Sequence, residues 1–150
     1  MPSSSPETIP AILNAVWQLS PSSILDVGAG YGKYGVLFRE YLELRHGKDE
    51  QNAINHHEDR NVVVDAVEGF ASYIGELHRA IYDEIFTVEL ENFLEREWQY
   101  DVVFLGDVLE HINKNAAQTN VIPSLVEGTK MGVLISVPAT VEKQTAVFGN

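Results

Sequence analysis

A short apolar run that leads straight into closely spaced glycines constrains this chain more than any other feature. The run covers Ile24 to Val27, and Gly28, Gly30 and Gly32 follow it directly. Apolar residues then recur at helical spacing from Tyr34 to Leu44. A buried strand, a tight turn and a helix in this order are typical of a parallel sheet in an α/β fold.

The rest of the chain repeats this alternation. Apolar runs predict further strands over residues 62–67, 84–88, 101–105 and 132–137. Helical spacing predicts helices over 7–19, 70–81 and 109–126, the last broken late by Pro123, with a brief helix or turn over 93–98 and a long polar loop over 46–61. Right-handed crossovers then predict a Rossmann-like, doubly wound, mostly parallel sheet with strand order 3-2-1-4-5.

The composition narrows the class of protein. A length of 150 residues suits one domain, and 22 acidic against 10 basic residues give a net charge of -12. Such a surface favours solubility and argues against nucleic acid or an anionic membrane as partner. The chain has no cysteine and no apolar run near the roughly 20 residues of a membrane span, so we expect a cytoplasmic protein without disulfides.

The glycine loop could hold a nucleotide-like cofactor. Glycine lets the backbone approach a ligand without a Cβ in the way, and the helix that follows presents free N–H groups. Residues 30–35 also match the dinucleotide pattern G-x-G-x-x-G. Two features argue against a nicotinamide cofactor. The pattern starts late relative to the strand end at Val27, and the carboxylate of Asp26 would repel a pyrophosphate but suit a cationic ligand.

Four segments, each at a strand end, resemble motifs of the class I S-adenosylmethionine (SAM)-dependent methyltransferases. Ile24 to Gly32 resembles the first motif and Val67-Glu68-Gly69 the second. Tyr100 to His111 resembles the motif of the fourth strand, and Gly132 to Pro138 the fifth strand and its exit. The resemblance spans roughly residues 24–138 and implies SAM as cofactor, with S-adenosylhomocysteine (SAH) as product.

The resemblance also implies a set of cofactor-binding residues. In the family, an acid at the end of the second strand binds both ribose hydroxyls, which points to Glu68, and Glu89, or else Glu91, falls near the adenine amino group. Glu68 follows Gly28 by 40 positions, more than the roughly 20 usual in dinucleotide folds, because of the polar loop. The implied set is Asp26, Gly28, Ala29, Gly30, Tyr31, Gly32, Glu68, Gly69, Phe70, Glu89, Leu90, Gly106, Asp107 and Val108.

Asp107 and His111 are weak candidates for catalytic residues. Four positions apart, they would share one face of a helix, and His111 could act as a general base. The favoured alternative is that Asp107 caps the helix and His111 packs beside the pocket. Positioning can supply most of the acceleration when the methyl acceptor is already nucleophilic, so the catalytic residues stay unassigned.

The remaining aromatic and histidine residues favour structural roles. We expect Trp17 in the core and Trp98 partly exposed, and we weigh Tyr31, Tyr34 and Phe70 evenly between pocket and core. A polar loop carries His46, His56, His57, Glu58 and Asp59 without rigid spacing. We therefore expect no metal site there.

Three functions follow from these patterns. The first is a methyltransferase acting on a small molecule or glycan. The second is a SAM- or SAH-binding module without turnover, or the regulatory half of a dimer. The third is a nicotinamide-dependent dehydrogenase. The family fold continues for two more strands, so we expect residues 1–150 to be a single SAM-binding domain shortened at its C-terminal end, with an open sheet edge that favours a homodimer.

Overall fold

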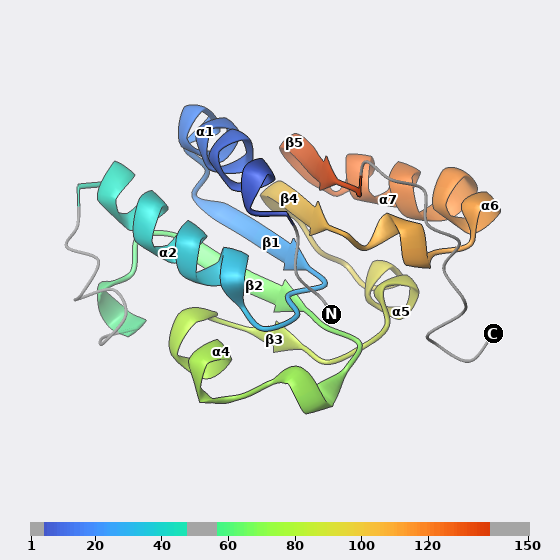
Figure 1. Cartoon of the computed structure of the whole chain (residues 1–150), viewed down its shortest axis with the longest axis horizontal. Coiled ribbons are helices and arrows are strands. Elements are labelled where there is room, and N and C mark those ends of the chain that lie inside the picture. Colours follow the sequence, from blue (N-terminus) through green and yellow to red (C-terminus); the bar gives the residue numbers. More distant parts are fainter. Residues whose placement is uncertain (1–4, 48–56, 139–150) are drawn as a thin grey trace.

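The computed structural model describes residues 5–47 and 57–138, which form one parallel sheet covered by helices on both faces (Figure 1). The strands lie in the order β3-β2-β1-β4-β5, and every neighbouring pair is parallel. This confirms the predicted fold class and strand order. The strands are β1 (Ser23–Val27), β2 (Val63–Val67), β3 (Ile85–Phe86), β4 (Tyr100–Gly106) and β5 (Thr129–Ser136).

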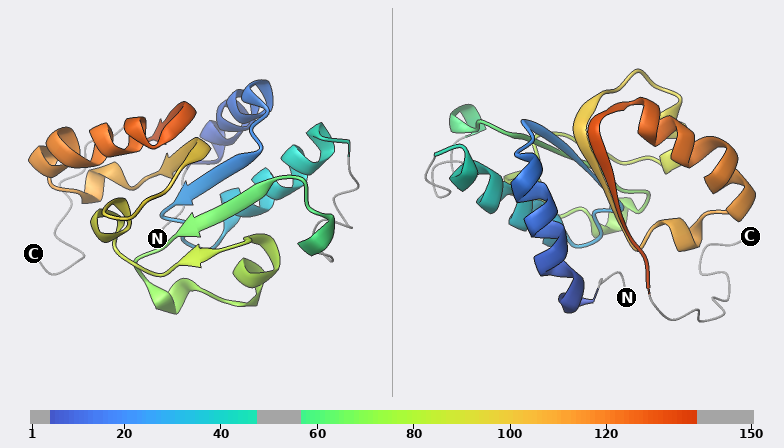
Figure 2. Two further views of the ribbon diagram at one scale, coloured as in Figure 1. Left: turned by 180° about the vertical axis from the view of Figure 1, so that it is seen from behind. Right: turned by 90° about the horizontal axis from the view of Figure 1, so that it is seen from above.

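Helices lie on both faces of the sheet (Figure 2), and alternate strand residues contribute to two separate hydrophobic cores beneath them. One face is covered by α1 (Ile9–Leu19), α2 (Lys33–Arg45) and α4 (Glu76–Ile81). The other is covered by α5 (Leu90–Leu94), α6 (Lys114–Ala116) and α7 (Ile122–Glu127). Ile24 packs on the first face and Leu25 on the second, and both are fully buried. Within the described ranges, no helix has the length and apolar character needed to cross a membrane.

Two segments were predicted as continuous helices, and this is wrong because both are interrupted. The segment 70–81 forms a 3-10 turn over Ala71–Tyr73 and then α4, because Gly75 adopts an extended backbone between them. The segment 109–126 starts as a 3-10 turn over Leu109–His111, and a new helix begins after Asn113, whose side chain accepts the N–H groups of residues 115 and 116.

Pro123 does not break the second of these segments. The chain continues from α6 through a π-helical stretch, Ala117–Val121, into α7, whose first turn holds the proline. Proline lacks the N–H that an α-helical turn needs, and a wider turn just before it accommodates that loss. Three other bounds differ from the prediction: β3 is shorter, β5 starts earlier, at Thr129, and the brief helix expected over 93–98 is α5, which lies at Leu90–Leu94.

Trp17 was expected in the core, and this is wrong. Its side chain is 36% exposed, and the guanidinium of Arg45 lies 5.3 Å from the ring centroid. Trp98 is partly buried against Phe93 and Tyr100, in line with the expectation for it.

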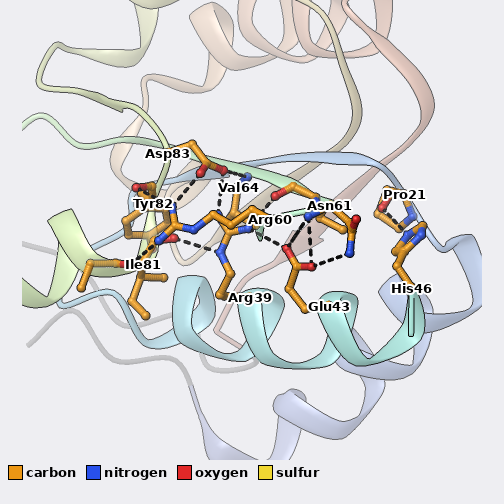
Figure 3. Close-up of polar contacts among 12 residues, drawn as sticks. Pro21, Arg39, Glu43, His46, Arg60, Asn61, Val64, Ile81, Tyr82 and Asp83 are labelled. Atoms are coloured by element: carbon orange, nitrogen blue, oxygen red, sulfur yellow. Dashed lines mark hydrogen bonds and ion pairs between the residues drawn. The ribbon is translucent and has the colours of Figure 1, made fainter. Parts of the chain in front are cut away.

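A buried ionic network ties α2 to the segments that precede β2 and β3 (Figure 3). Arg39 is fully buried and donates to Glu43 Oε1 at 3.1 Å, Asp83 Oδ2 at 2.7 Å and the carbonyl of Ile81 at 3.1 Å. Arg60 donates to the second oxygen of Asp83 at 2.6 Å. The two cations hold the pKa of Asp83 below its usual value, against the effect of burial. The network anchors both ends of the polar loop.

Candidate functional site

The candidate site lies at the carboxyl end of β1, where the order in which strands are added to the sheet changes side. The strand order runs outward from β1 through β2 to β3 and then returns to β4 on the other side of β1. The carboxyl ends of β1 and β4 thus mark the switch point at which open α/β sheets bind ligands. The glycine loop follows β1 at this point, β4 ends here at Gly106, and Asp107 and Val108 follow it.

The backbone of the glycine loop is fixed between β2 and β4. Gly28, Gly30 and Gly32 all have positive φ, at 72°, 56° and 82°, a region that side chains disfavour. The N–H groups of Gly28 and Ala29 both point to the carbonyl of Val67, at 2.8 and 3.4 Å. A Cβ on Gly28 would collide with the side chain of Val108. The loop therefore requires glycine at position 28 for packing as well as for conformation.

Glu68 lies at the end of β2, as predicted, and its carboxylate touches the glycine loop. Its side chain is almost completely buried. Oε2 accepts the N–H of Gly30 at 2.8 Å, and Oε1 accepts the N–H of Phe70 at 2.9 Å. Each carboxylate oxygen can accept a second hydrogen bond, so capacity remains for two ligand hydroxyls.

The structure distinguishes between the two acids considered for the adenine end. A Cβ placed on Gly69 would lie 3.2 Å from Oε1 of Glu89, so this exposed carboxylate reaches the end of β2. Glu91 lies in the first turn of α5. Leu90 is 7% exposed and belongs to the hydrophobic core on the face of the sheet that α5 covers. Glu89 is therefore the better placed of the two acids.

Asp26 lies in β1, two residues before the first glycine of the loop, and is buried. It is 2% exposed, and the hydroxyl of Tyr82 donates to its Oδ2 at 2.6 Å. Burial raises the pKa of Asp26 to about 7, with a further increase from the charge of Glu68, although the Tyr82 hydrogen bond lowers it. Burial thus makes the negative charge of Asp26 weaker near neutral pH than that of an ordinary aspartate, and direct contact of Asp26 with a cofactor stays a prediction.

Of the three aromatic residues weighed between pocket and core, Tyr34 lies in the core, and Tyr31 and Phe70 are exposed near the glycine loop. Tyr34 is buried, with its ring centroid 4.4 Å from that of Phe104. Tyr31 is 57% exposed and lies 5.2 Å from the ring of Tyr73, which lies 5.5 Å from the ring of Phe70. An aromatic cluster of three rings therefore flanks the glycine loop, and the sequence did not single out Tyr73.

The exit of β4 differs from the helix expected there. Asp107 has a left-handed backbone, with φ of 55°, and its N–H donates to the carbonyl of Ser136 at 2.9 Å. His111 ends the 3-10 turn and is exposed. Asp107 precedes this turn, so the two residues do not share a helical face. Asp107 is also not its N-cap, since Val108 holds that position.

Glu110 is a residue of this region that sequence reasoning missed. Among the described residues, its Oε2 is the one buried side-chain oxygen or nitrogen without a hydrogen-bond partner. Burial raises the pKa of Glu110, with a further increase from the charge of Asp107 and a decrease from His111. An unpartnered buried oxygen next to a strained residue marks the β4 exit as unusual for a purely structural turn.

His78 was also missed, although it contacts the loop directly. Its Nε2 lies 2.9 Å from the carbonyl of Gly30, and the ring is 3% exposed. The sequence carries no local signal for this contact, because the two residues are 48 positions apart.

Two other regions do not add to the site. In the polar loop, His46 Nε2 lies 3.3 Å from the carbonyl of Pro21, and His56 falls outside the described residues. Across residues 5–47 and 57–138, no three His, Asp or Glu side chains cluster as metal ligands. A hollow of about 320 Å³ opens near the amino end of β4, where Asp65 already accepts from Tyr100 and from the N–H of Glu84.

Comparisons with known proteins agree with this geometry at the level of the fold. No family model matches the chain, and no curated protein matches it in sequence. An O-methyltransferase from Bacillus cereus in complex with SAH superposes with a TM-score of 0.60 at 12% identity, over 89% of this chain and 56% of that chain. TehB from Haemophilus influenzae gives 0.58 at 19% identity, over 84% and 39%.

A third structure, the methyltransferase domain of bacterial CtHen1, gives a TM-score of 0.56 at 16% identity, over 86% of this chain and 64% of that chain. The chain thus spans less than two thirds of each of these three structures. At such identities the likeness concerns the fold. This chain has the fold of the class I SAM-dependent methyltransferases.

Proposed function

We propose that this chain binds SAM and is a SAM-dependent methyltransferase, with a small molecule or a glycan as methyl acceptor. The observation that carries the proposal is Glu68, whose carboxylate borders the glycine loop at the switch point and keeps two acceptor positions. Three structures of similar fold are complexes with SAH: DhpI, the Bacillus cereus enzyme and the plantazolicin methyltransferase BpumL. They support the same ligand here.

The residues of the site fit the parts of this cofactor. Glu68 would accept hydrogen bonds from the two ribose hydroxyls, and Glu89 would accept one from the amino group of adenine. The backbone at Gly28 and Gly30 lets the ligand approach without a Cβ in the way. Bound SAM supplies a methyl group on a sulfonium, which needs an oriented nucleophile more than it needs acid–base help. The task of the chain is therefore to hold and align.

Two features support the proposed class of methyl acceptor: the residues that follow β4, and the net charge of the chain. Asp107, Glu110 and His111 follow β4 at the switch point, and Glu110 keeps an oxygen without a partner. The net charge of -12 disfavours nucleic acid as acceptor. Met131 and Ile135 on the edge strand β5 are about half exposed, so we also propose that a second copy could pair there.

A second candidate function is a SAM- or SAH-binding module without turnover. It is favoured by the exit of β4, where the helix expected to carry both Asp107 and His111 is replaced by a left-handed residue and a 3-10 turn. The two functions share the cofactor site and differ only in methyl transfer, so one set of experiments separates them.

The test is calorimetric titration of the purified chain with SAH and with NADH. We expect SAH to bind, NADH not to bind, and Glu68→Ala to lose affinity for SAH. Glu127→Ala is the matched control, because Glu127 is exposed at the far end of α7. Failure of SAH to bind the wild-type chain would refute both functions. Binding without SAH formation from labelled SAM, across small-molecule and glycan acceptors, would favour the second.

A further inference from the structure

His78 in α4 uses both ring nitrogens, and they serve different parts of the fold. Nδ1 lies 3.2 Å from the backbone nitrogen of Gly75, and Nε2 lies 2.9 Å from the carbonyl oxygen of Gly30. The ring is 3% exposed and stacks on Tyr82 with centroids 6.0 Å apart. Figure 1 shows α4 lying beside the first part of α2, where the glycine loop ends.

The hydrogen-bond partners fix the proton on this ring. A backbone N–H can only donate, so Nδ1 of His78 must accept from Gly75. A carbonyl oxygen can only accept, so Nε2 must carry the hydrogen and donate to Gly30. The arrangement therefore needs the neutral imidazole with its hydrogen on Nε2.

The structural role of His78 accounts for only one of these bonds. Its Nδ1 satisfies the N–H of Gly75, the N-cap of α4, in the manner of a capping box. The bond from Nε2 is not part of the cap of α4, since it ends on Gly30, 48 positions earlier in the chain. What that second bond fixes is the glycine loop.

Gly30 is consequently held from both sides by side chains. Its N–H donates to Glu68 at 2.8 Å, and its carbonyl accepts from His78 at 2.9 Å. In a trans peptide, the carbonyl of Gly30 and the N–H of Tyr31 point in opposite directions. Because the carbonyl points to the buried His78 ring, the N–H of Tyr31 is directed to the other side of the loop.

We propose that His78 is a positioning residue for the cofactor: its Nε2–H orients the peptide between Gly30 and Tyr31 and so sets the affinity of the loop for SAH. This rests on the proposed function, since it assumes that the glycine loop binds SAH. His78 itself touches no ligand. It acts through Gly30, which it holds in the conformation that places Glu68 and the Tyr31 N–H on the ligand side.

Two conservative variants separate the positioning bond from the capping bond. In His78→Gln, the side-chain amide nitrogen falls near the position of Nε2 and can still donate to Gly30. In His78→Asn, the shorter amide reaches only the position of Nδ1 and can still accept from Gly75. Both variants lose the stacked ring against Tyr82, so each serves as the control of the other.

The expected result is a selective loss of SAH affinity. By calorimetry, the Kd of His78→Asn should rise by about tenfold or more, the equivalent of about 1.4 kcal/mol, while that of His78→Gln stays within about threefold of wild type. Without ligand, amide hydrogen exchange at residues 28–32 should speed up in the Asn variant and not in the Gln variant. Thermal midpoints should fall to a similar extent in both.

Equal loss of affinity in the two variants would overturn the proposal, because the ring and not its Nε2–H would then matter. Equal exchange rates at residues 28–32 in the two variants would overturn it as well. If wild-type protein does not bind SAH, the proposed function fails by that result alone, whereas the exchange measurement, made without ligand, still judges the positioning of Gly30 separately.

Discussion

Replacing Asp26 by asparagine should make this protein more stable near neutral pH. The carboxyl group of Asp26 is completely buried, and burial raises its pKa to about 7 even though the hydroxyl of Tyr82 donates to it at 2.6 Å. Asparagine has almost the same shape, and its carbonyl oxygen can accept the same hydrogen bond. It carries no charge that burial would penalise, so the variant removes the ionisation and keeps the hydrogen bond from Tyr82, while its amide nitrogen, unlike a carboxylate oxygen, cannot accept the backbone N–H of Gly35.

The sign and size of the effect follow from the two pKa values of Asp26. In the unfolded chain this carboxyl ionises near 3.8, and in the folded chain near 7. Below 3.8 both states are protonated, and the pH has no effect through this group. Between 3.8 and 7 only the unfolded chain ionises, so stability falls as pH rises, by about 1.4 kcal/mol per pH unit, and the loss reaches about 4 kcal/mol above pH 7.

The assay is urea unfolding of wild type and Asp26→Asn at pH 5, 6, 7 and 8. The stability difference between the two proteins should grow in favour of asparagine from pH 5 to about pH 7 and then level off. Glu127→Gln, an exposed neutralisation, should give a difference that does not change over this range. A difference for Asp26→Asn that stays constant from pH 5 to 8 would refute the reasoning, since Asp26 would then not ionise in that window.

Three further substitutions test the site and the buried network. Glu68→Ala should weaken SAH binding by roughly 1.5–3 kcal/mol in calorimetry, the range for hydrogen bonds to a charged group, and unchanged affinity would remove Glu68 from the site. Gly30→Val should abolish SAH binding, because φ of 56° disfavours a branched side chain; circular dichroism checks folding, and normal binding by folded protein would show the loop misassigned. Arg39→Ala should lower the urea-derived stability by about 3–5 kcal/mol, because it leaves the fully buried Glu43 without its cation and removes one of the two cations that pair with Asp83, whereas Lys130→Ala, which removes an exposed lysine 3.6 Å from Asp101, should change it by less than about 1 kcal/mol; equal effects would contradict the buried network.

The strands and their order could be predicted because the signal for them is local. Buried strands of a parallel sheet are continuous apolar runs, and the handedness of crossovers leaves few ways to arrange them. Glu68 was found for a related reason, since its position at the end of β2 follows from the strand itself. The breaks in two helices were missed because Gly75 and Asn113 act through backbone geometry that helical spacing does not report.

The interior of the site could not be predicted, because its contacts join distant parts of the chain. Tyr82 reaches Asp26 across 56 positions, and His78 reaches Gly30 across 48. A side chain on the apolar face of a helix looks the same in sequence whether it fills the core or holds a loop. Motifs place Asp26 at a strand end, but they do not show that its carboxylate accepts the hydroxyl of Tyr82, the residue that follows α4.

Binding of SAH at the glycine loop should protect α4 from hydrogen exchange, because α4 and the loop open together. A helix of six residues has little stability alone, and two of the bonds that hold α4, those of His78 and Tyr82, end on Gly30 and on Asp26 just before the loop. A ligand that binds only the closed loop lowers the open fraction in proportion to its concentration over Kd. At about 100 times Kd, exchange at the amides of α4 should slow by up to about a hundredfold, while exchange in α7 stays unchanged. Slower exchange at residues 28–32 with no change in α4 would show that the two segments open independently, and the bonds of His78 and Tyr82 would then be too weak to couple them.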